Sequence, residues 1–555
     1  MVLPLQGWVT LRHYSLRWLP PDFLAGLTVA AYLVPQCMAY GDLAGVGPAV
    51  GLWTVLPALF VYFWLGSSPQ VSVGPESTTA VMTAVTVGAL VTTYGGSYAL
   101  AAALVASLVG VVCLIAYLAR LGFLADLLSR PILIGYMTGV ALIMIVGQLG
   151  KVSGIGIESN SMPGQMLEFL GHLRQVHAPT LALSLCLLVF LFGVQAFFPR
   201  LPGPLLAVLL ATLVVWLGNL EAQGIAVVGA IPVGFPRPQL PLVSGAEAWQ
   251  ALTAALGIAV VAYSDNVLTA RAFATRNRYT IDPSQELLAL GMANLAAGLM
   301  QGFPVSSSAS RATIGDSLGS KTQVYSLVSW GVVGVVLLWL RPLLALFPKA
   351  ALGTLVIYAA TRLIDLGEFR RLQQFRWNDC ALAILTTLGV LATNLLVGVA
   401  IAVALSMMEV LARVARPHDA VMGRVPGLAG LHDISDWPGA TTMPGLLLYR
   451  YDAPLFFANI EDFKRRALRA IDQETAAVRW FVLNAEAIGE IDITAADMLA
   501  DLYDELTARG ITMGMARVKQ DLYIQLERSG LLAQLGDHIY FTLPTAIEAF
   551  LKSGN

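Results

Sequence analysis

Three ionisable side chains, Glu76, Asp265 and Arg311, fall within or at the edge of long apolar stretches of this sequence. An ionised side chain at the centre of a bilayer costs roughly 2.5 to 3.5 kcal/mol on insertion scales, so such residues are functional candidates. The segment Pro304-Val-Ser-Ser-Ser-Ala-Ser-Arg311 brings four hydroxyls to the start of a helix beside a cation. Free amides at a helix N-terminus and serine hydroxyls together bind anions. These residues predict an anion site inside a membrane.

A second segment matches this one in the other half of the chain. Pro69-Gln-Val-Ser-Val-Gly-Pro75 leads into a short apolar run that starts at Ser77, just as Gly302-Phe-Pro-Val305 leads into the run 306–318. Paired short segments interrupted by Gly and Pro usually mark the substrate site of a transporter. If both open helices, two positive dipole ends converge on one anion. Ordinary short helices flanked by turns are the alternative.

The carboxyl of Glu76 would repel a bound anion unless it carried a proton, and burial favours the neutral carboxyl. We therefore expect Glu76, and Asp265 as a second candidate, to take up a proton that travels with the anion. Three alternatives stay open. Glu76 could be paired with a cation throughout; Arg311 could pair with Asp265 or Asp316; and Asp265, followed one turn later by Thr269, could bind sodium together with backbone carbonyls.

These residues need membrane helices to hold them, and the composition predicts such helices. The chain has 555 residues, of which 57% are hydrophobic and only 12% charged, whereas soluble chains are roughly a quarter charged. About 20 apolar residues span the hydrocarbon layer as a helix. Fourteen apolar runs are predicted, seven in each half: 23–43, 50–65, 77–93, 100–118, 131–148, 180–198 and 204–217, then 249–270, 287–300, 306–318, 324–340, 343–361, 380–396 and 397–414.

The loops between these runs predict the orientation. Most loop lysines and arginines lie on the side of the N-terminus, which predicts that both termini are cytoplasmic. An odd number of spans per half also predicts two inverted repeats. We expect an N-terminal segment at 1–21 and a transmembrane domain at 22–415, with repeats at about 22–221 and 248–415.

The C-terminal part has the charge density of a soluble domain. Residues 416–444 read as a polar linker rich in Gly and Pro, followed by a domain at 445–555. Strands at 446–451 and 480–483 alternate with helices at 462–471, 494–509 and 522–529, which is typical of a small α/β domain.

Several classes of function are disfavoured by the sequence. A net charge of −2 without a basic stripe gives no reason to expect nucleic-acid binding. The four cysteines lack metal-ligand spacing, and neither a catalytic triad nor a phosphate-binding loop is found. We therefore expect a protein that is not an enzyme and that has no cofactor or metal.

The segments Asp22-Phe-Leu-Ala-Gly-Leu-Thr-Val-Ala-Ala-Tyr-Leu-Val-Pro-Gln-Cys-Met-Ala-Tyr40, Pro48-Ala-Val-Gly-Leu-Trp53 and Gly66-Ser-Ser-Pro-Gln-Val-Ser-Val-Gly-Pro75 resemble the SulP family of anion permeases, also called solute carrier family 26. The tail from Gly445 resembles the STAS domain of that family, so the resemblance covers nearly the whole chain. Within this family, the sequence most resembles actinobacterial members described as probable sulfate transporters.

This resemblance implies a fold of fourteen spans in two inverted repeats. A core domain, spans 1 to 4 and 8 to 11, would move like an elevator against a gate domain, in a homodimer in the bacterial inner membrane. The family's substrate residues map to Gln36, Tyr40, Glu76, Ser308, Ser310 and Arg311, and Asp265 matches an acidic position associated with ion coupling.

Two departures from the family pattern are visible in the membrane part, and one turn stands out in the STAS part. Trp53 replaces a usual Tyr, which we expect to be harmless. Glu76 stands where the animal exchangers carry an apolar residue, which favours proton symport over exchange. Glu490-Ile-Asp-Ile-Thr494 resembles a turn that carries a phosphorylatable residue in related domains, although Thr494 could simply begin a helix.

The sequence thus predicts secondary active transport of a small inorganic anion, sulfate first, by proton symport. A sodium-coupled transporter of bicarbonate or of C4 dicarboxylates is the alternative within transport. From another class, an anion channel or a membrane sensor that signals through its STAS domain remains open.

Overall fold

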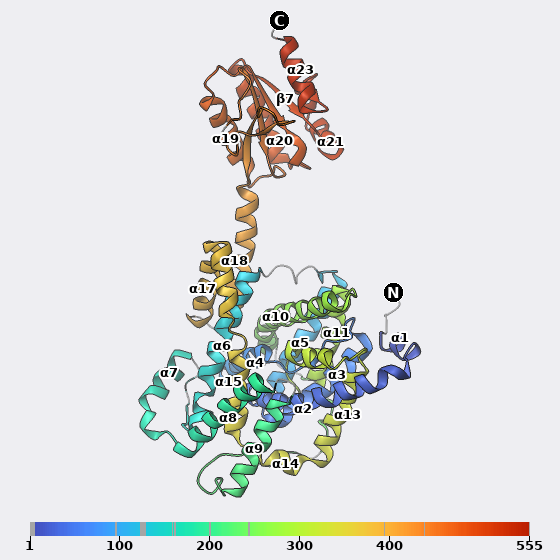
Figure 1. The fold of residues 1–555 in the computed structure, drawn as a ribbon, viewed down its shortest axis with the longest axis vertical. Helices are drawn as coiled ribbons and strands as arrows, with labels where there is room; N and C mark the ends of the chain where they lie inside the picture. Colours follow the sequence, from blue (N-terminus) through green and yellow to red (C-terminus); the bar gives the residue numbers. More distant parts are fainter. Residues whose placement is uncertain are drawn as a thin grey trace. The chain divides into compact units, whose positions relative to one another are not determined.

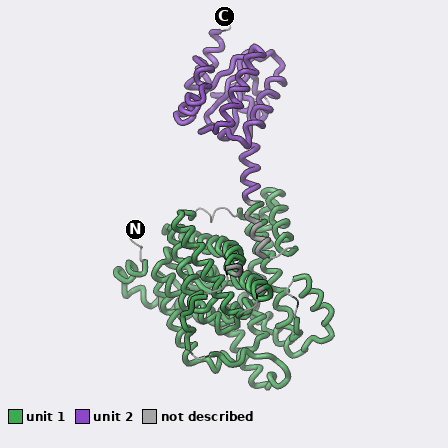
Figure 2. Tube along the Cα trace, turned by 180° about the vertical axis from the view of Figure 1, so that it is seen from behind, with its two compact units in different colours: residues 1–406 green, residues 407–555 purple. Residues whose placement is uncertain are grey.

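The computed structural model describes residues 6–94, 97–122, 129–157, 159, 162–198, 201–232, 234–241, 245–392, 395–437 and 439–553. The first five residues of the predicted N-terminal segment, and residues 393–394 of the run predicted at 380–396, lie outside this part. The chain forms two compact units, residues 1–406 and 407–555 (Figure 2).

The first unit is almost entirely helical (Figure 1). Among the described residues, seven helices are long and apolar enough to cross a membrane, and four more apolar helices, among them α4 and α9, are shorter. The elements are α1 (Gln6–Arg12), η1 (Leu16–Trp18), α2 (Leu19–Leu43), α3 (Pro48–Leu65), β1 (Val73–Gly74), α4 (Ser77–Tyr94), α5 (Tyr98–Leu118), α6 (Arg130–Ser153), α7 (Met162–Gly171), η3 (Leu173–Gln175), α8 (Ala178–Phe197), α9 (Gly203–Leu217), α10 (Gly245–Asn277), α11 (Pro283–Leu299), β2 (Ser306–Ser307), α12 (Ala309–Ser317), α13 (Val324–Trp339), α14 (Arg341–Ala345), α15 (Lys349–Thr361), α16 (Leu366–Phe375), α17 (Trp377–Ala392) and α18 (Leu395–Ala415), which continues into the second unit.

The predicted apolar runs correspond to helices, with two differences. The run predicted at 343–361 is broken into α14 and α15 at Pro348, because proline has no amide hydrogen and holds its neighbour in an extended conformation. The run predicted at 306–318 begins as strand β2, and its helix starts only at Ala309. Helices α1, α7 and α16 were not predicted. The number of spans and the inverted relation of the two halves remain predictions.

The helices of the first unit pack in two groups. In one group, α11 lies along α3 and α5 while α13 lies along α2 and α3; in the other, α6 packs against α15 and α17. Helix α2 makes most of the contact between the groups, against α9 and α15. Glycines allow close approach within each group. A Cβ on Gly51 would lie 1.8 Å from the Cys37 carbonyl oxygen, and one on Gly135 would lie 2.1 Å from that of Ala383.

The second unit is an α/β domain built on a six-stranded sheet of order β4-β3-β5-β6-β7-β8, in which β5 to β8 are parallel. Helices α19 to α22 bury their apolar side chains on one face and α23 covers the other. The elements are β3 (Asp419–Gly423), β4 (His432–Asp433), β5 (Leu446–Tyr451), α19 (Ile460–Gln473), β6 (Trp480–Asn484), η4 (Ala485–Ala487), α20 (Ile493–Ala508), β7 (Thr512–Ala516), α21 (Gln520–Arg528), α22 (Leu531–Leu535), β8 (Ile539–Tyr540) and α23 (Leu543–Ser553).

The prediction of a linker at 416–444 needs a correction. Strands β3 and β4 lie within it, and β3 pairs antiparallel with β5 from Asp419 to Met422. The edge of a parallel sheet offers unpaired amides and carbonyls to any extended segment, which the polar composition of this stretch did not reveal.

Candidate functional site

Two short extended segments meet inside the first unit. Strands β1 and β2 pair antiparallel, with Val73 opposite Ser307 and Gly74 opposite Ser306. The Ser308 amide continues the ladder, donating to the Ser72 carbonyl over 2.9 Å. Helix α4 follows β1 and helix α12 follows β2. The pairing therefore brings the N-termini of two helices, far apart in sequence, next to one another.

Buried polar side chains satisfy the backbone of both extended segments, as an apolar setting requires. The Asn294 side chain donates to the Val305 carbonyl and accepts from the Val305 amide, at 3.1 and 2.9 Å. Gln323 Nε2 donates to the carbonyls of Ser68 and Val71, at 2.7 and 2.8 Å. These two amides fix the position of the helix ends. Sequence reasoning missed them, although a lone Asn within an apolar run was a visible signal.

A cavity of about 420 Å³ opens at these helix ends. One wall comes from α2 and the starts of α4 and α12, and the opposite wall comes from α8, α9 and α15. Six predicted substrate residues line the first wall: Gln36, Tyr40, Glu76, Ser77, Ser308 and Ser310. The structure thus brings together residues from Gln36 to Ser310, which are far apart in the sequence.

The hydrogen-bonding groups at the helix ends are suited to an anion. Ser308 is the N-cap of α12, yet its side chain makes no capping bond; its Oγ lies 3.1 Å from Ser310 Oγ. Ser77 Oγ donates to Glu76 Oε1 over 3.1 Å. The first amides of any helix lack partners within it. Hydroxyls and amides of both helices can therefore donate to one oxyanion.

Arg311 lies behind this wall rather than in the cavity. Its side chain is 0% exposed; Nη1 donates to the Pro75 carbonyl over 3.0 Å, and Nε to Ser72 Oγ over 3.4 Å. Nη1 also lies 3.6 Å from Glu76 Oε2. Arg311 therefore pairs with Glu76. Asp316, one of the partners considered from the sequence, pairs instead with Arg276 at 3.2 Å.

The other coupling candidates lie away from the cavity. Asp265 Oδ2 accepts from Thr78 Oγ1 over 3.3 Å, and its carbonyl accepts from Ser307 Oγ over 3.3 Å. The Asp265 carboxyl thus contacts α4 near its N-terminus. Thr269 makes no hydrogen bond to Asp265 in the part of the chain that the structure describes.

Sequence reasoning also missed a carboxylate. Glu286 is fully buried and accepts hydrogen bonds from Tyr62, Ser67 and Asn266. It lies one residue before the run predicted at 287–300, so it read as a charge at the end of a span. Its bonds join α3, α10 and α11 just ahead of the first extended segment.

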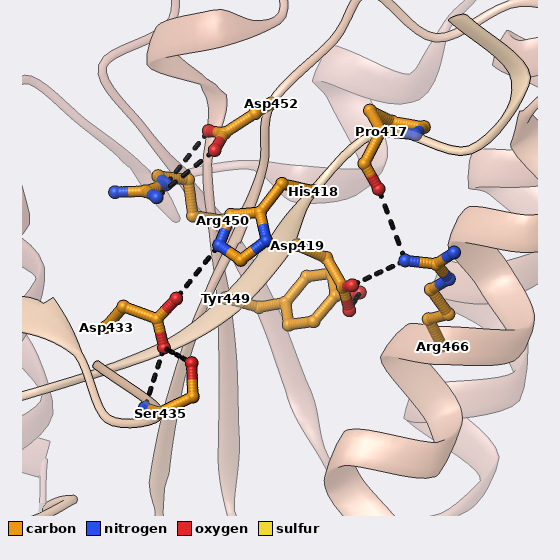
Figure 3. A network of polar contacts seen from close by, with 9 residues as sticks. All are labelled: Pro417, His418, Asp419, Asp433, Ser435, Tyr449, Arg450, Asp452 and Arg466. Carbon is orange, nitrogen blue, oxygen red and sulfur yellow. Dashed lines mark hydrogen bonds and ion pairs between the residues drawn. The ribbon is translucent and has the colours of Figure 1, made fainter. Parts of the chain in front are cut away.

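A second cavity, of about 810 Å³, lies in the second unit between α19 and β3. Several charged side chains around it are paired. Figure 3 shows Arg466, which reaches Asp419 at 2.6 Å and donates to the Pro417 carbonyl over 3.2 Å. Arg466 also lies 2.8 Å from Asp462. These bonds hold the start of β3 against α19. The network therefore stabilises the packing of the domain.

Asp433 in β4 also lines this second cavity (Figure 3). His418 Nε2 lies 2.9 Å from its carboxylate, and the Ser435 amide and hydroxyl donate to it over 2.8 and 2.6 Å. Burial acts to raise the pKa of Asp433, but the bonds from Ser435 and His418 outweigh burial and lower it. The carboxylate is therefore stabilised in its ionised form.

Thr494 is exposed and is the second residue of α20. The cap of this helix is Asp492, whose Oδ1 accepts from the Ala495 amide over 2.8 Å while Oδ2 accepts from the Phe457 amide over 2.8 Å. The helix start therefore does not depend on the Thr494 hydroxyl.

Comparison with known proteins decides the family. The model of the sulfate permease family matches residues 19–386, and that of the STAS domain matches residues 438–546. A probable sulfate transporter of Mycobacterium tuberculosis is 52% identical over 547 residues, which cover 98% of each chain. This chain belongs to the sulfate permease family. The prediction of a transporter rather than an enzyme is thereby confirmed.

Solved structures share the fold of this permease. The murine solute carrier 26 family member A9 anion transporter, in the inward-facing state, is 22% identical with a TM-score of 0.91, covering 100% of this chain and 94% of that one. The transmembrane domain of the cyanobacterial bicarbonate transporter BicA is 20% identical with a TM-score of 0.62, covering 71% and 97%. The permease is thus a multi-pass helical membrane protein with a C-terminal α/β STAS domain.

Proposed function

We propose that this permease transports sulfate by secondary active transport coupled to protons. The observation that carries the proposal is that one cavity is lined by the N-termini of both α4 and α12. Sulfate presents four oxygens, which suit hydroxyls and amides that converge from two helices. Relatives described as sulfate transporters in Mycobacterium tuberculosis and Arabidopsis thaliana support this choice of anion.

The pairing of Glu76 with Arg311 supports coupling to a proton. While Glu76 is ionised, it balances the charge of Arg311, and the site attracts an anion through dipoles alone. A proton on Glu76 leaves the Arg311 charge unbalanced. Two unit charges about 5 Å apart interact by about 3 kcal/mol at an effective dielectric constant near 20. Proton and anion would therefore bind together, with Asp265 as a second proton acceptor.

The two helix groups support alternating access. The cavity lies between them, with the helix ends on one group and α8, α9 and α15 on the other. We assign the first group to a core that moves like an elevator against the second, within fourteen spans of two inverted repeats. The proposal includes a homodimer in the bacterial inner membrane with both termini cytoplasmic.

Sodium coupling through Asp265 and Thr269 receives less support, because the Asp265 carboxyl is bonded to Thr78. Phosphorylation of the exposed Thr494 stays a separate proposal for control of the STAS domain.

The test is uptake of radiolabelled sulfate into proteoliposomes with an imposed pH or sodium gradient. We expect accumulation driven by an acidic exterior and independent of sodium. Glu76→Gln should transport sulfate without regard to the pH gradient, while Glu221→Gln, at an exposed loop carboxylate, should behave like the wild type. Uptake driven by sodium, or proton-driven uptake by Glu76→Gln, would contradict the coupling. Absence of sulfate uptake would refute the function.

A further inference from the structure

A cluster of three polar side chains lies on the cavity wall opposite the helix ends. Arg362, at the end of α15, donates from Nη1 to Gln195 Oε1 over 2.7 Å and to the Tyr358 hydroxyl over 3.2 Å. Tyr358 donates to the same Gln195 oxygen over 2.9 Å. All three line the cavity. Gln195 and Tyr358 therefore hold the guanidinium in place from two helices, α8 and α15.

The charge of Arg362 is not neutralised by the described residues around it. Its side chain is exposed, and its printed polar contacts among the described residues are with Gln195 and Tyr358, neither of which is a carboxylate. Its bonds go to a neutral amide oxygen and a neutral phenol, which orient the guanidinium without cancelling its charge. Its centre also lies 5.9 Å from the centroid of the Tyr358 ring.

Arg362 and Arg311 differ in what they offer a solute. Arg311 is buried behind the paired strands and balanced by Glu76. Among the described residues that line the cavity, Arg362 alone carries a positive charge, and Glu76 alone a negative one. An anion that enters while Glu76 is ionised would therefore meet its attractive charge on the wall formed by α8 and α15.

We propose that Arg362, held by Gln195 and Tyr358, is a second anion contact of this cavity, which captures the oxyanion before it reaches the helix ends. The inference rests on the proposed function, since the ligand is the transported anion. A fixed charge at the mouth of a cleft raises the local concentration of the opposite ion and its rate of association. Binding of the anion by the hydroxyls and amides at the N-termini of α4 and α12 would be unchanged.

The location predicts which kinetic constant responds. Loss of the Arg362 charge should raise the KM for sulfate and leave kcat nearly unchanged, because the charge acts on capture rather than on the translocation step. The effect should also depend on salt, since mobile ions screen an exposed charge over about 8 Å at physiological ionic strength. A purely structural role for the cluster would instead lower stability and kcat together.

In the proposed topology the end of α15 that carries Arg362 faces the cytoplasm, so the anion must be offered from that side. The experiment therefore measures initial rates of radiolabelled sulfate transport from the cytoplasmic side, in proteoliposomes of inside-out orientation, at low and high ionic strength. We expect Arg362→Gln to raise KM about tenfold at low ionic strength and to flatten its salt dependence. Gln195→Glu keeps the side-chain shape but places a carboxylate beside the guanidinium, so it should have the same effect. Arg362→Lys should recover part of the loss. Arg174→Gln, at an exposed arginine of η3 that does not line the cavity, is the matched control.

The outcomes separate this inference from the proposed function. If Arg362→Gln and Gln195→Glu both keep the wild-type KM while Ser308→Ala raises it, the second contact does not exist and the transport site stands. A fall in kcat and in thermal stability without a change in KM assigns the cluster a structural role and overturns the inference. If the wild type takes up no sulfate, both proposals fail.

Discussion

The buried carboxylate of Glu286 gives the sharpest prediction about stability. Oε1 accepts from the Ser67 amide at 2.9 Å, the Ser67 hydroxyl at 2.7 Å and the Tyr62 hydroxyl at 3.1 Å; Oε2 accepts from Tyr62 at 2.9 Å and from Asn266 Nδ2 at 2.6 Å. No described cation pairs with it. Four donor groups therefore depend on one side chain.

Glu286→Leu removes the acceptor from all four donors. A buried donor left unsatisfied costs about 1–3 kcal/mol, and partial rearrangement reduces the sum. We expect a loss of about 3–5 kcal/mol, comparable to removing one partner of a buried pair. This corresponds to a fall of roughly 5–10 °C in Tm.

Glu286→Gln should be far milder, at about 1 kcal/mol, which is typical of one ordinary hydrogen bond. The new amide would oppose Asn266 Nδ2, but Asn266 Oδ1 is buried without a partner among the described residues. If the Asn266 amide rotates, its Oδ1 can accept a hydrogen bond from the new amide nitrogen at position 286. In an Asn266→Ala background this acceptor is absent, so there the same substitution should cost about 1–3 kcal/mol more than it does beside Asn266.

The assay is thermal unfolding of the purified protein in detergent, followed by intrinsic fluorescence, with the exposed Glu221→Leu as control. Glu286→Leu with the stability of the wild type would refute the account of the network. Equal damage from the Gln and Leu variants would refute the proposed rotation of Asn266.

Other predictions concern helix packing, the contact between the helix groups, and acid stability. Gly51→Ala should prevent correct folding, since its Cβ would lie 1.8 Å from a carbonyl oxygen of α2; a normal monodisperse peak in size-exclusion chromatography would contradict this. Lys151 Nζ lies 2.6 Å from Asp42 Oδ2 and joins α6 to α2. Lys151→Met should therefore alter the uptake rate up to about fivefold, and exchanging the two residues should restore the rate. An unchanged rate in Lys151→Met would contradict a role for this pair. Because the pKa of Asp433 is lowered in the folded domain, its contribution is present above about pH 4 and is lost as the pH falls further. Asp433→Asn should therefore flatten the decline of the domain's Tm between pH 5 and pH 3, and an unchanged decline would contradict this.

The sequence predicted the helical elements well because most of them are continuous apolar runs. The break at Pro348 also had a visible cause, since proline ends a helix at the preceding residue. Strand β3 was hidden because its pairing is with residues of β5 that lie well beyond it in sequence. Polar, Gly-containing composition does not distinguish an edge strand from a linker.

The site was predicted in part. Ser77 and Ser308 could be placed at helix starts from Gly and Pro patterns alone, and the structure brings both to one cavity. The direction in which Arg311 points could not be predicted, because it depends on the carbonyl of Pro75, which reaches it only through the pairing of β1 and β2. Arg362 directly follows the run predicted at 343–361 and so reads as an ordinary loop charge, because its support from Gln195 on α8 is distant in sequence.

The most direct test of the anion site is a structure determined with selenate, a tetrahedral analogue of sulfate that can be located by its anomalous signal. We predict one peak in the cavity within hydrogen-bonding distance of Ser77 and Ser308, and its loss when both are replaced by residues with bulky apolar side chains. A peak elsewhere in the membrane unit, with nothing between the ends of α4 and α12, would contradict the account.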